Sequence, residues 1–206
     1  MQIQNHQRQT RLLHLLPLVL VFILLANGLV LLYFFLHEAG HALVVLLFRG
    51  KLTAFKVGFF DSHYSYQGQF SAFQNGIRTS AGVLFPVLVW LVCLVWMPRR
   101  IAPMWSALRM IAAWIVLGSL LPWVIKPLLT MFGYQSRAPF GDDILGFLEA
   151  THWNGVLVSL ISLLLLGLLL LVFQSRAGFR ESLHDLQQLS REGFHLHRKD
   201  AERSSG

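Results

Sequence analysis

The chain is poor in charged residues, which make up only 13% of its 206 positions, while hydrophobic residues make up 55%. A water-soluble domain carries about 25% charged and about 45–50% apolar residues. A shortfall of this size is too large for the core of a soluble protein to account for. The composition therefore excludes an ordinary soluble domain and indicates a chain that is solvated largely by lipid.

Cysteine is almost absent, since Cys93 is the only one in the chain. A single cysteine excludes an intrachain disulfide and a zinc site built from several thiolates. Any metal ion must therefore be bound by histidine and carboxylate side chains.

Acidic residues are outnumbered by basic ones, and the net charge is +7. The basic residues do not form a concentrated patch but stand singly or in pairs between apolar runs, as Arg99 and Arg100 do. This is the distribution of loop charges that flank membrane spans. We therefore expect the lipid bilayer, and not a nucleic acid, as a partner.

The sequence contains four long apolar runs with few charged residues. They cover residues 12–48, 79–98, 100–126 and 155–173. A membrane-spanning helix needs about 20 apolar residues. The second and fourth runs fit directly, and the third fits if Arg109 extends to an interface. We predict an all-α polytopic membrane protein with about four transmembrane helices.

The first run is longer than one perpendicular span requires, because its length as a helix would be on the order of 55 Å. We expect one long helix that begins near Pro17, although Asn27-Gly28 could divide it into two short spans. A cleaved signal peptide is a further alternative, since Arg8 and Arg11 precede the apolar residues. The run continues directly into the segment HEAGH, so we interpret it as a retained span.

Two segments have a different character from the apolar runs. Residues 52–70 are rich in aromatic and β-forming residues around Asp61-Ser62-His63, which predicts a small β-hairpin after the first span. Asn75-Gly76 then predicts a turn before the second span. Residues 176–206 are polar with an amphipathic pattern, so we divide the chain into a membrane-embedded domain, 1–175, and a C-terminal tail, 176–206.

The chemistry is carried by His37-Glu38-Ala39-Gly40-His41, an HExxH pattern within the first apolar run. Histidines at positions i and i+4 of a helix face the same side, so both can bind one zinc ion. Glu38 adjoins the first ligand and can act as general base on a zinc-bound water. Ionisable residues inside a membrane are costly, so three on one helical turn indicate a functional site more strongly than a hydrogen-bonded structural cluster.

The segment FFLHEAGHALVVLLFRG resembles the first core helix of the site-2 protease family of intramembrane zinc metallopeptidases, in particular its short bacterial branch without a PDZ domain. Arg49-Gly50 followed by the predicted hairpin, and Ser80-Ala81-Gly82 in the second span, also resemble that branch. The resemblance implies a protease that holds one Zn²⁺ ion in a multi-pass membrane protein of the bacterial cytoplasmic membrane. Its substrate would be a membrane protein or membrane peptide.

The resemblance also implies a third zinc ligand, an aspartate in a later membrane segment. The family's Asn-Pro-x-x-Asp-Gly context is missing here, but residues 141–151, GDDILGFLEAT, resemble the Gly-x-Asp helix start of the short branch. By that alignment Asp143 is the ligand and Asp142 its neighbour. An aspartate at a helix start is also an ordinary N-cap, so one carboxylate could cap the helix while the other binds metal.

The sequence leaves alternatives open for the function of the protein and for its orientation in the membrane. A non-catalytic zinc-binding scaffold or a metal-handling transporter would use the same histidines, although a transporter is expected to place polar residues on several spans. The side of the membrane that holds the two termini carries more basic residues than the loops on the opposite side, which favours cytoplasmic termini. The resemblance to family members with a cytoplasmic hairpin points the other way. The sequence does not indicate an oligomeric state.

Overall fold

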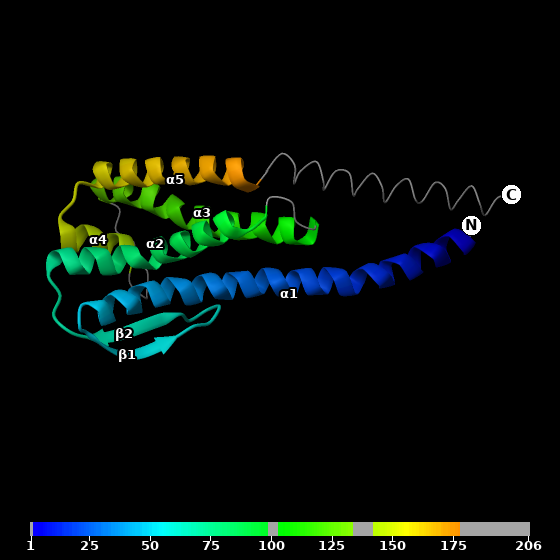
Figure 1. The fold of residues 1–206 in the computed structure, drawn as a ribbon, viewed down its shortest axis with the longest axis horizontal. Coiled ribbons are helices and arrows are strands. Elements are labelled where there is room, and N and C mark those ends of the chain that lie inside the picture. The colour runs from blue at the N-terminus through cyan, green and yellow to red at the C-terminus, as the bar shows by residue number, and fades with distance from the viewer. Residues whose placement is uncertain (1, 99–102, 134–141, 178–206) are drawn as a thin grey trace.

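The computed structural model describes residues 2–98, 103–133 and 142–177 (Figure 1). Four of its helices are long and apolar enough to cross a membrane, as predicted. A small antiparallel sheet follows the first of them. In chain order the elements are α1 (Gln2–Leu47), β1 (Lys51–Lys56), β2 (His63–Gln67), α2 (Ala72–Trp96), α3 (Pro103–Met131), α4 (Asp143–Thr151) and α5 (Gly155–Ala177). The chain is a multi-pass membrane protein.

Helix α1 is a single continuous helix, so neither Asn27 nor Gly28 breaks it. The side-chain amide of Asn27 donates to the carbonyl of Ile23 at 2.8 Å and is thereby satisfied within the helix. The predicted start near Pro17 is wrong, because the helix begins at Gln2 and Pro17 lies inside it. Proline lacks one backbone N–H, and here that loss does not end the helix.

The predicted hairpin is present after α1. Strands β1 and β2 pair antiparallel from Lys51 opposite Gln67 to Lys56 opposite His63, with an irregularity between Leu52 and Ala54. The connecting loop covers residues 57–62, which contains most of the expected turn. In Figure 1 the hairpin lies alongside the C-terminal part of α1.

Helix α2 begins earlier than predicted. Ser71 and Gln74 form a reciprocal capping box that starts the helix at Ala72, and a capping box supplies partners to otherwise unpaired backbone N–H groups. Asn75-Gly76 therefore lies inside α2 and is not a turn. The glycine is needed there for close packing, because a Cβ atom on Gly76 would lie 2.5 Å from Cγ2 of Thr151 in α4.

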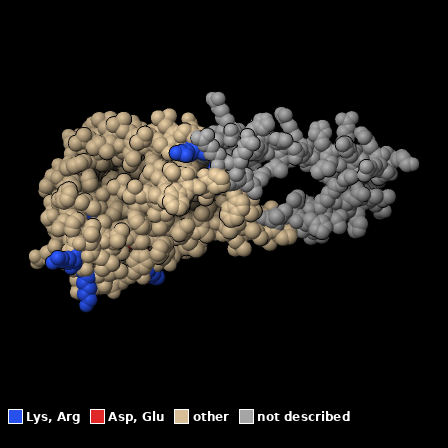
Figure 2. All heavy atoms as spheres, in the orientation of Figure 1, with Lys and Arg blue, Asp and Glu red and all other residues tan. Residues whose placement is uncertain are grey.

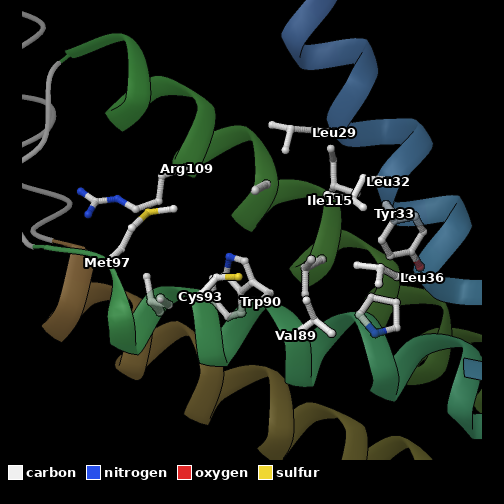
Figure 3. A pocket seen from close by; sticks show the side chains of 14 residues that line it. Leu29, Leu32, Tyr33, Leu36, Val89, Trp90, Cys93, Met97, Arg109 and Ile115 are labelled. Atoms are coloured by element: carbon white, nitrogen blue, oxygen red, sulfur yellow. The ribbon is translucent and has the colours of Figure 1, made fainter.

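Helices α2, α3 and α5 share an apolar core that includes Trp90, Leu120 and Leu169. The ring of Trp90 lies 5.9 Å from that of Phe173. Arg109 of α3 is only 6% exposed, and the expectation that it extends to a membrane interface stays a prediction. Its side chain lies beside Met97, at the C-terminal end of α2 (Figure 3).

Many large apolar side chains are exposed on the surface of the described residues. Figure 2 shows only a few separate Lys and Arg side chains, and no Asp or Glu, on the visible face of the described residues. Leucines at exposed positions of α5, such as Leu164 at 74%, have no protein cover. Such a surface is stable in lipid, as the composition predicted. Apart from residues 176 and 177, which end α5, the predicted tail lies outside the described residues.

Candidate metal centre

Helix α1 carries the three motif residues near its C-terminal end. The rings of His37 and His41 lie 4.9 Å apart at 83° to each other, as the i, i+4 spacing predicted. His41 is 1% exposed and Glu38 is 7% exposed. The Glu38 carboxyl is close enough to interact electrostatically with both histidines. At about 1.5 Å per residue, His41 lies roughly 9 Å before the end of the helix at Leu47, within the span.

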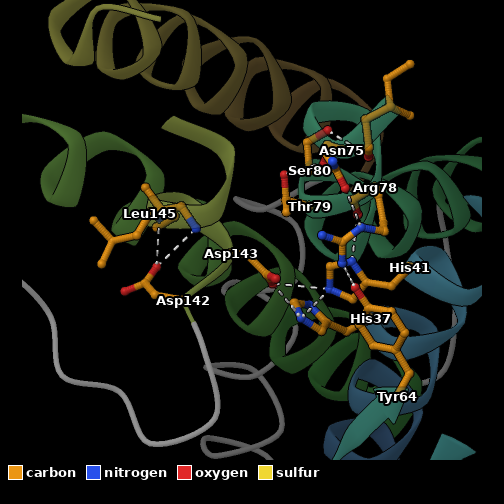
Figure 4. A network of polar contacts seen from close by, with 12 residues as sticks. His37, His41, Tyr64, Asn75, Arg78, Thr79, Ser80, Asp142, Asp143 and Leu145 are labelled. Carbon is orange, nitrogen blue, oxygen red and sulfur yellow. Dashed lines mark hydrogen bonds and ion pairs between the residues drawn. The ribbon is translucent and has the colours of Figure 1, made fainter. Parts of the chain in front are cut away.

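Helix α4 brings Asp143 to the two histidines from a distant part of the sequence. Its Oδ2 atom lies 3.1 Å from Nε2 of His37 and 3.2 Å from Nε2 of His41. The two Nε2 atoms lie 3.3 Å from each other, so the three atoms form a nearly equilateral triangle (Figure 4). Within the described part of the chain, these three residues form the group that could hold a metal ion.

The size of this triangle fits a metal ion. Zinc binds histidine nitrogen and carboxylate oxygen at about 2.0–2.2 Å, which separates neighbouring ligands of a tetrahedral ion by about 3.3–3.6 Å. The three observed separations, from 3.1 to 3.3 Å, are close to that range. The donor set of two imidazoles and one carboxylate is also one that zinc accepts.

The hydrogen bonding of His41 gives a second, independent test of the fit. Nδ1 of His41 lies 2.6 Å from the main-chain carbonyl of Arg78. Because a carbonyl only accepts, Nδ1 carries the hydrogen, and in a neutral imidazole Nε2 then presents a lone pair. That lone pair faces the carboxylate of Asp143, another acceptor, so a cation or a proton must lie between them. A carbonyl that orients a ligating histidine in this way is typical of metal sites.

Asp143 is held in the ionised form that a metal ligand requires. Burial raises the pKa of Asp143, but where the imidazoles face it with hydrogens, their hydrogen bonds and charges outweigh burial and hold it well below its usual range. Where they present lone pairs, a metal ion takes the place of those hydrogens as the partner of the carboxylate. The carboxyl group is therefore a carboxylate at neutral pH.

The two neighbouring aspartates have different positions, as one of the alternatives from the sequence predicted. Asp142 is the N-cap of α4, and its Oδ1 accepts from the backbone N–H groups of Ile144 and Leu145 at 3.0 and 3.4 Å. Its Oδ2 accepts from Nζ of Lys126 at 2.6 Å. Burial raises the pKa of Asp142, but these hydrogen bonds and the charge of Lys126 lower it overall. Asp142 thus anchors α4 to α3, and Asp143 points to the histidines.

Glycines in α1 and α2 allow the two helices to approach at the site. A Cβ atom on Gly82 would lie 2.6 Å from Cε1 of His41 and 2.7 Å from Cε1 of His37. A Cβ atom on Gly40 would lie 2.8 Å from Cβ of Phe85. Side chains at these positions would occupy the space of the imidazoles or separate the helices.

Strand β2 forms one wall of the centre. The ring of Tyr64 stacks on that of His41 at 4.8 Å and 14°. The guanidinium of Arg78 donates to the Tyr64 hydroxyl and lies 4.6 Å from the ring centroid of Tyr66. Burial, its largest influence, raises the pKa of Tyr64 to about 12, so the phenol stays protonated at physiological pH. Arg78 therefore connects the hairpin to α2 directly beside a metal-ligand candidate.

The remaining candidate residues are not part of the triangle, although His63 is close enough to Glu38 to interact with it electrostatically. Asp61 and His63 are 40% and 42% exposed and hydrogen bonded to each other at 2.8 Å. His152 is exposed at the C-terminal end of α4. Sequence reasoning missed Lys126, Arg78 and Tyr64 as supports of the site. Lys126 could have been found as a basic residue at the end of an apolar run. Arg78 could have been found because it lies one helical turn before Gly82 on the same face of α2.

Comparison of the chain with models of known protein families, with curated proteins and with solved structures gave no match.

Proposed function

We propose that this protein is an intramembrane zinc metalloprotease that hydrolyses peptide bonds of membrane protein substrates, with Glu38 as general base. The observation that carries the proposal is the triangle of His37, His41 and Asp143. The two histidines and Glu38 lie on a helix long enough to span a membrane, and Asp143 reaches them from the short helix α4. A structural zinc site has four protein ligands, whereas a catalytic site has three and keeps one position open. Three ligand candidates are brought together within the described residues, which favours catalysis.

Zinc, when bound, supplies a Lewis acid for the scissile carbonyl and makes water acidic enough to be deprotonated near neutral pH. The chain supplies the rest. The Glu38 carboxylate takes a proton from the attacking water and returns it to the amide nitrogen as the C–N bond breaks. His37, His41 and Asp143 would hold the ion, and the main-chain carbonyl of Arg78 orients His41. The protein is predicted to work in the bacterial cytoplasmic membrane.

The hairpin provides a means of presenting the substrate. A helical substrate hides its carbonyls in hydrogen bonds, so it must be unwound before attack. An extended segment can add to the free edge of a two-stranded sheet, and β2 places Tyr64 directly on His41. Proline substitutions in residues 52–56 of the hairpin, in the strand that does not carry Tyr64, should impair cleavage and leave zinc content intact; unchanged cleavage would contradict this presentation.

The proposed function is tested by Glu38→Gln, with Glu149→Gln as the control, because Glu149 is exposed on α4. Zinc stoichiometry and cleavage of membrane-spanning peptides are measured on purified protein in lipid. We expect Glu38→Gln to keep zinc and lose cleavage by about 10²-fold or more, while Glu149→Gln matches the wild type. Wild-type protein that binds zinc but cleaves none of the peptides would instead favour the scaffold.

A further inference from the structure

An apolar cavity of about 250 Å³ lies between α1, α2 and α3 (Figure 3). Leu29, Leu32 and Leu36 line it from α1, Val89 and Cys93 from α2, and Ile115 from α3. Apolar cavities of about 150 Å³ already bind a benzene-sized ligand. The cavity is therefore large enough to take apolar groups of a ligand.

On α1 this cavity continues the face that carries the metal ligands. Residues four apart along a helix lie one above the other. Counting back from the metal centre in steps of four gives His41, His37, Tyr33 and Leu29. The last two line the cavity, and the rings of Tyr33 and His37 lie 6.0 Å apart.

The same continuity holds on α2. Gly82, against which the two imidazoles pack, is followed on the same face by residues at spacings of three or four: Pro86, Val89, Cys93 and Met97. All four of these line the cavity. One face of each of two helices thus leads from the metal centre into the cavity.

We propose that this cavity is a substrate subsite that receives apolar residues of a membrane-spanning peptide on one side of the scissile bond. The inference rests on the proposed function and names where its substrate lies. A peptide whose carbonyl reaches the metal centre has this cavity as the adjoining space between the helices. The lining is apolar apart from Arg109, which lies at the end away from the metal centre, and it matches apolar side chains. A lipid acyl chain is the competing occupant, because Leu32 and Met97 of the lining are exposed. The experiments below distinguish the two occupants.

Cys93 makes the register of the peptide measurable, because it lines the cavity and is the only cysteine of the chain. It is eleven residues beyond Gly82 on α2, which is about 16 Å along the helix. A peptide extended at about 3.3 Å per residue would place its residue about five positions from the scissile bond beside Cys93. A helical peptide would place a residue about eleven positions away there.

The first experiment is disulfide cross-linking in zinc-loaded, full-length Glu38→Gln protein in phosphatidylcholine vesicles. The probes are polyleucine-based spanning peptides around a bond that the wild type cleaves, each with one cysteine at a successive position. We expect cross-linking to Cys93 to peak about five or about eleven positions from that bond, on one side only, and to vanish in Cys93→Ser. Uniform or absent cross-linking would overturn the subsite.

The second experiment fills the cavity with Ala112→Phe and uses Leu164→Phe, on the lipid-facing surface of α5, as control. We expect Ala112→Phe to lower kcat/KM for the spanning peptide by about tenfold or more at unchanged zinc stoichiometry, and Leu164→Phe to match the wild type. Unchanged cleavage by Ala112→Phe would assign the cavity to lipid and overturn the inference. Absence of cleavage by the wild type itself would instead overturn the proposed function, and the subsite with it.

Discussion

The two halves of the helical bundle are held together by different interactions. In the half next to the hairpin, polar contacts join separate elements, such as Lys126 with Asp142 and Arg78 with Tyr64. In the half that contains the C-terminal ends of α2 and α5, apolar side chains such as Trp90 and Leu169 pack together, and Arg109 is also buried there. Lipid offers no partners to polar groups, so polar residues in a membrane protein are kept where they have a partner or a function. The polar half is therefore where chemistry is expected.

Among the changes that compare the two halves, the largest effect should come from a methyl group added beside the ligands. Gly82→Ala would push a Cβ atom into both imidazoles, and we expect metal affinity to fall by about 10- to 100-fold, the range for residues that orient ligands. Gly118→Ala in α3 is the matched control, because its Cβ atom would meet no atom within 4 Å. Equal metal affinity in the two variants, measured by titration, would contradict the geometry.

Packing should dominate in the apolar half. Leu169 is 2% exposed and Leu171, on the same helix, is 65% exposed. We expect Leu169→Ala to lower the free energy of unfolding by about 2 kcal/mol, the low end for buried leucines, because lipid is as apolar as the core and only packing is lost. Leu171→Ala should be nearly neutral, and neither variant should change metal affinity. Denaturation in mixed micelles would measure both, and metal loss in Leu169→Ala would break the contrast between the halves.

The hairpin wall should have a smaller effect on the metal centre. Tyr64→Phe keeps the ring that stacks on His41 but removes the hydroxyl that accepts from Arg78. We expect metal affinity to fall by about tenfold or less. Tyr66→Phe keeps the ring beneath the Arg78 guanidinium and should match the wild type. If metal affinity fell more in Tyr66→Phe than in Tyr64→Phe, the contact between Arg78 and the Tyr64 hydroxyl would not be what supports the metal centre.

The smallest effect concerns the anchor of α4. The pKa of Asp142 in the folded protein is lowered from its ordinary value of 3.8, so the carboxylate stabilises the fold above that pH and the contribution is lost as the pH falls below it. We expect Lys126→Met to lower the free energy of unfolding by about 1 kcal/mol at neutral pH. The difference from wild type should shrink below about pH 4. A difference that is constant down to acidic pH would contradict the ion pair.

The apolar runs and the HExxH spacing could be read from the sequence because both are local patterns with fixed helical periods. The start of α2 was predicted wrongly because Asn75-Gly76 is a typical turn pair, whereas Ser71 and Gln74 already form a capping box. The assignment of Asp142 and Asp143 remained open because both are acidic residues at one helix start. What separates them is Lys126, sixteen residues away in the chain, and a contact of that range has no local pattern.

The pair of adjacent aspartates gives the most direct measurement of the central claim. Zinc stoichiometry is determined for the purified wild type, for Asp143→Ala and for Asp142→Asn, which keeps a residue that can cap α4. The account predicts one zinc per wild-type chain, retention in Asp142→Asn and loss in Asp143→Ala. A wild type without bound zinc, or an Asp143→Ala variant that keeps it as tightly as Asp142→Asn does, would contradict a metal centre formed by His37, His41 and Asp143.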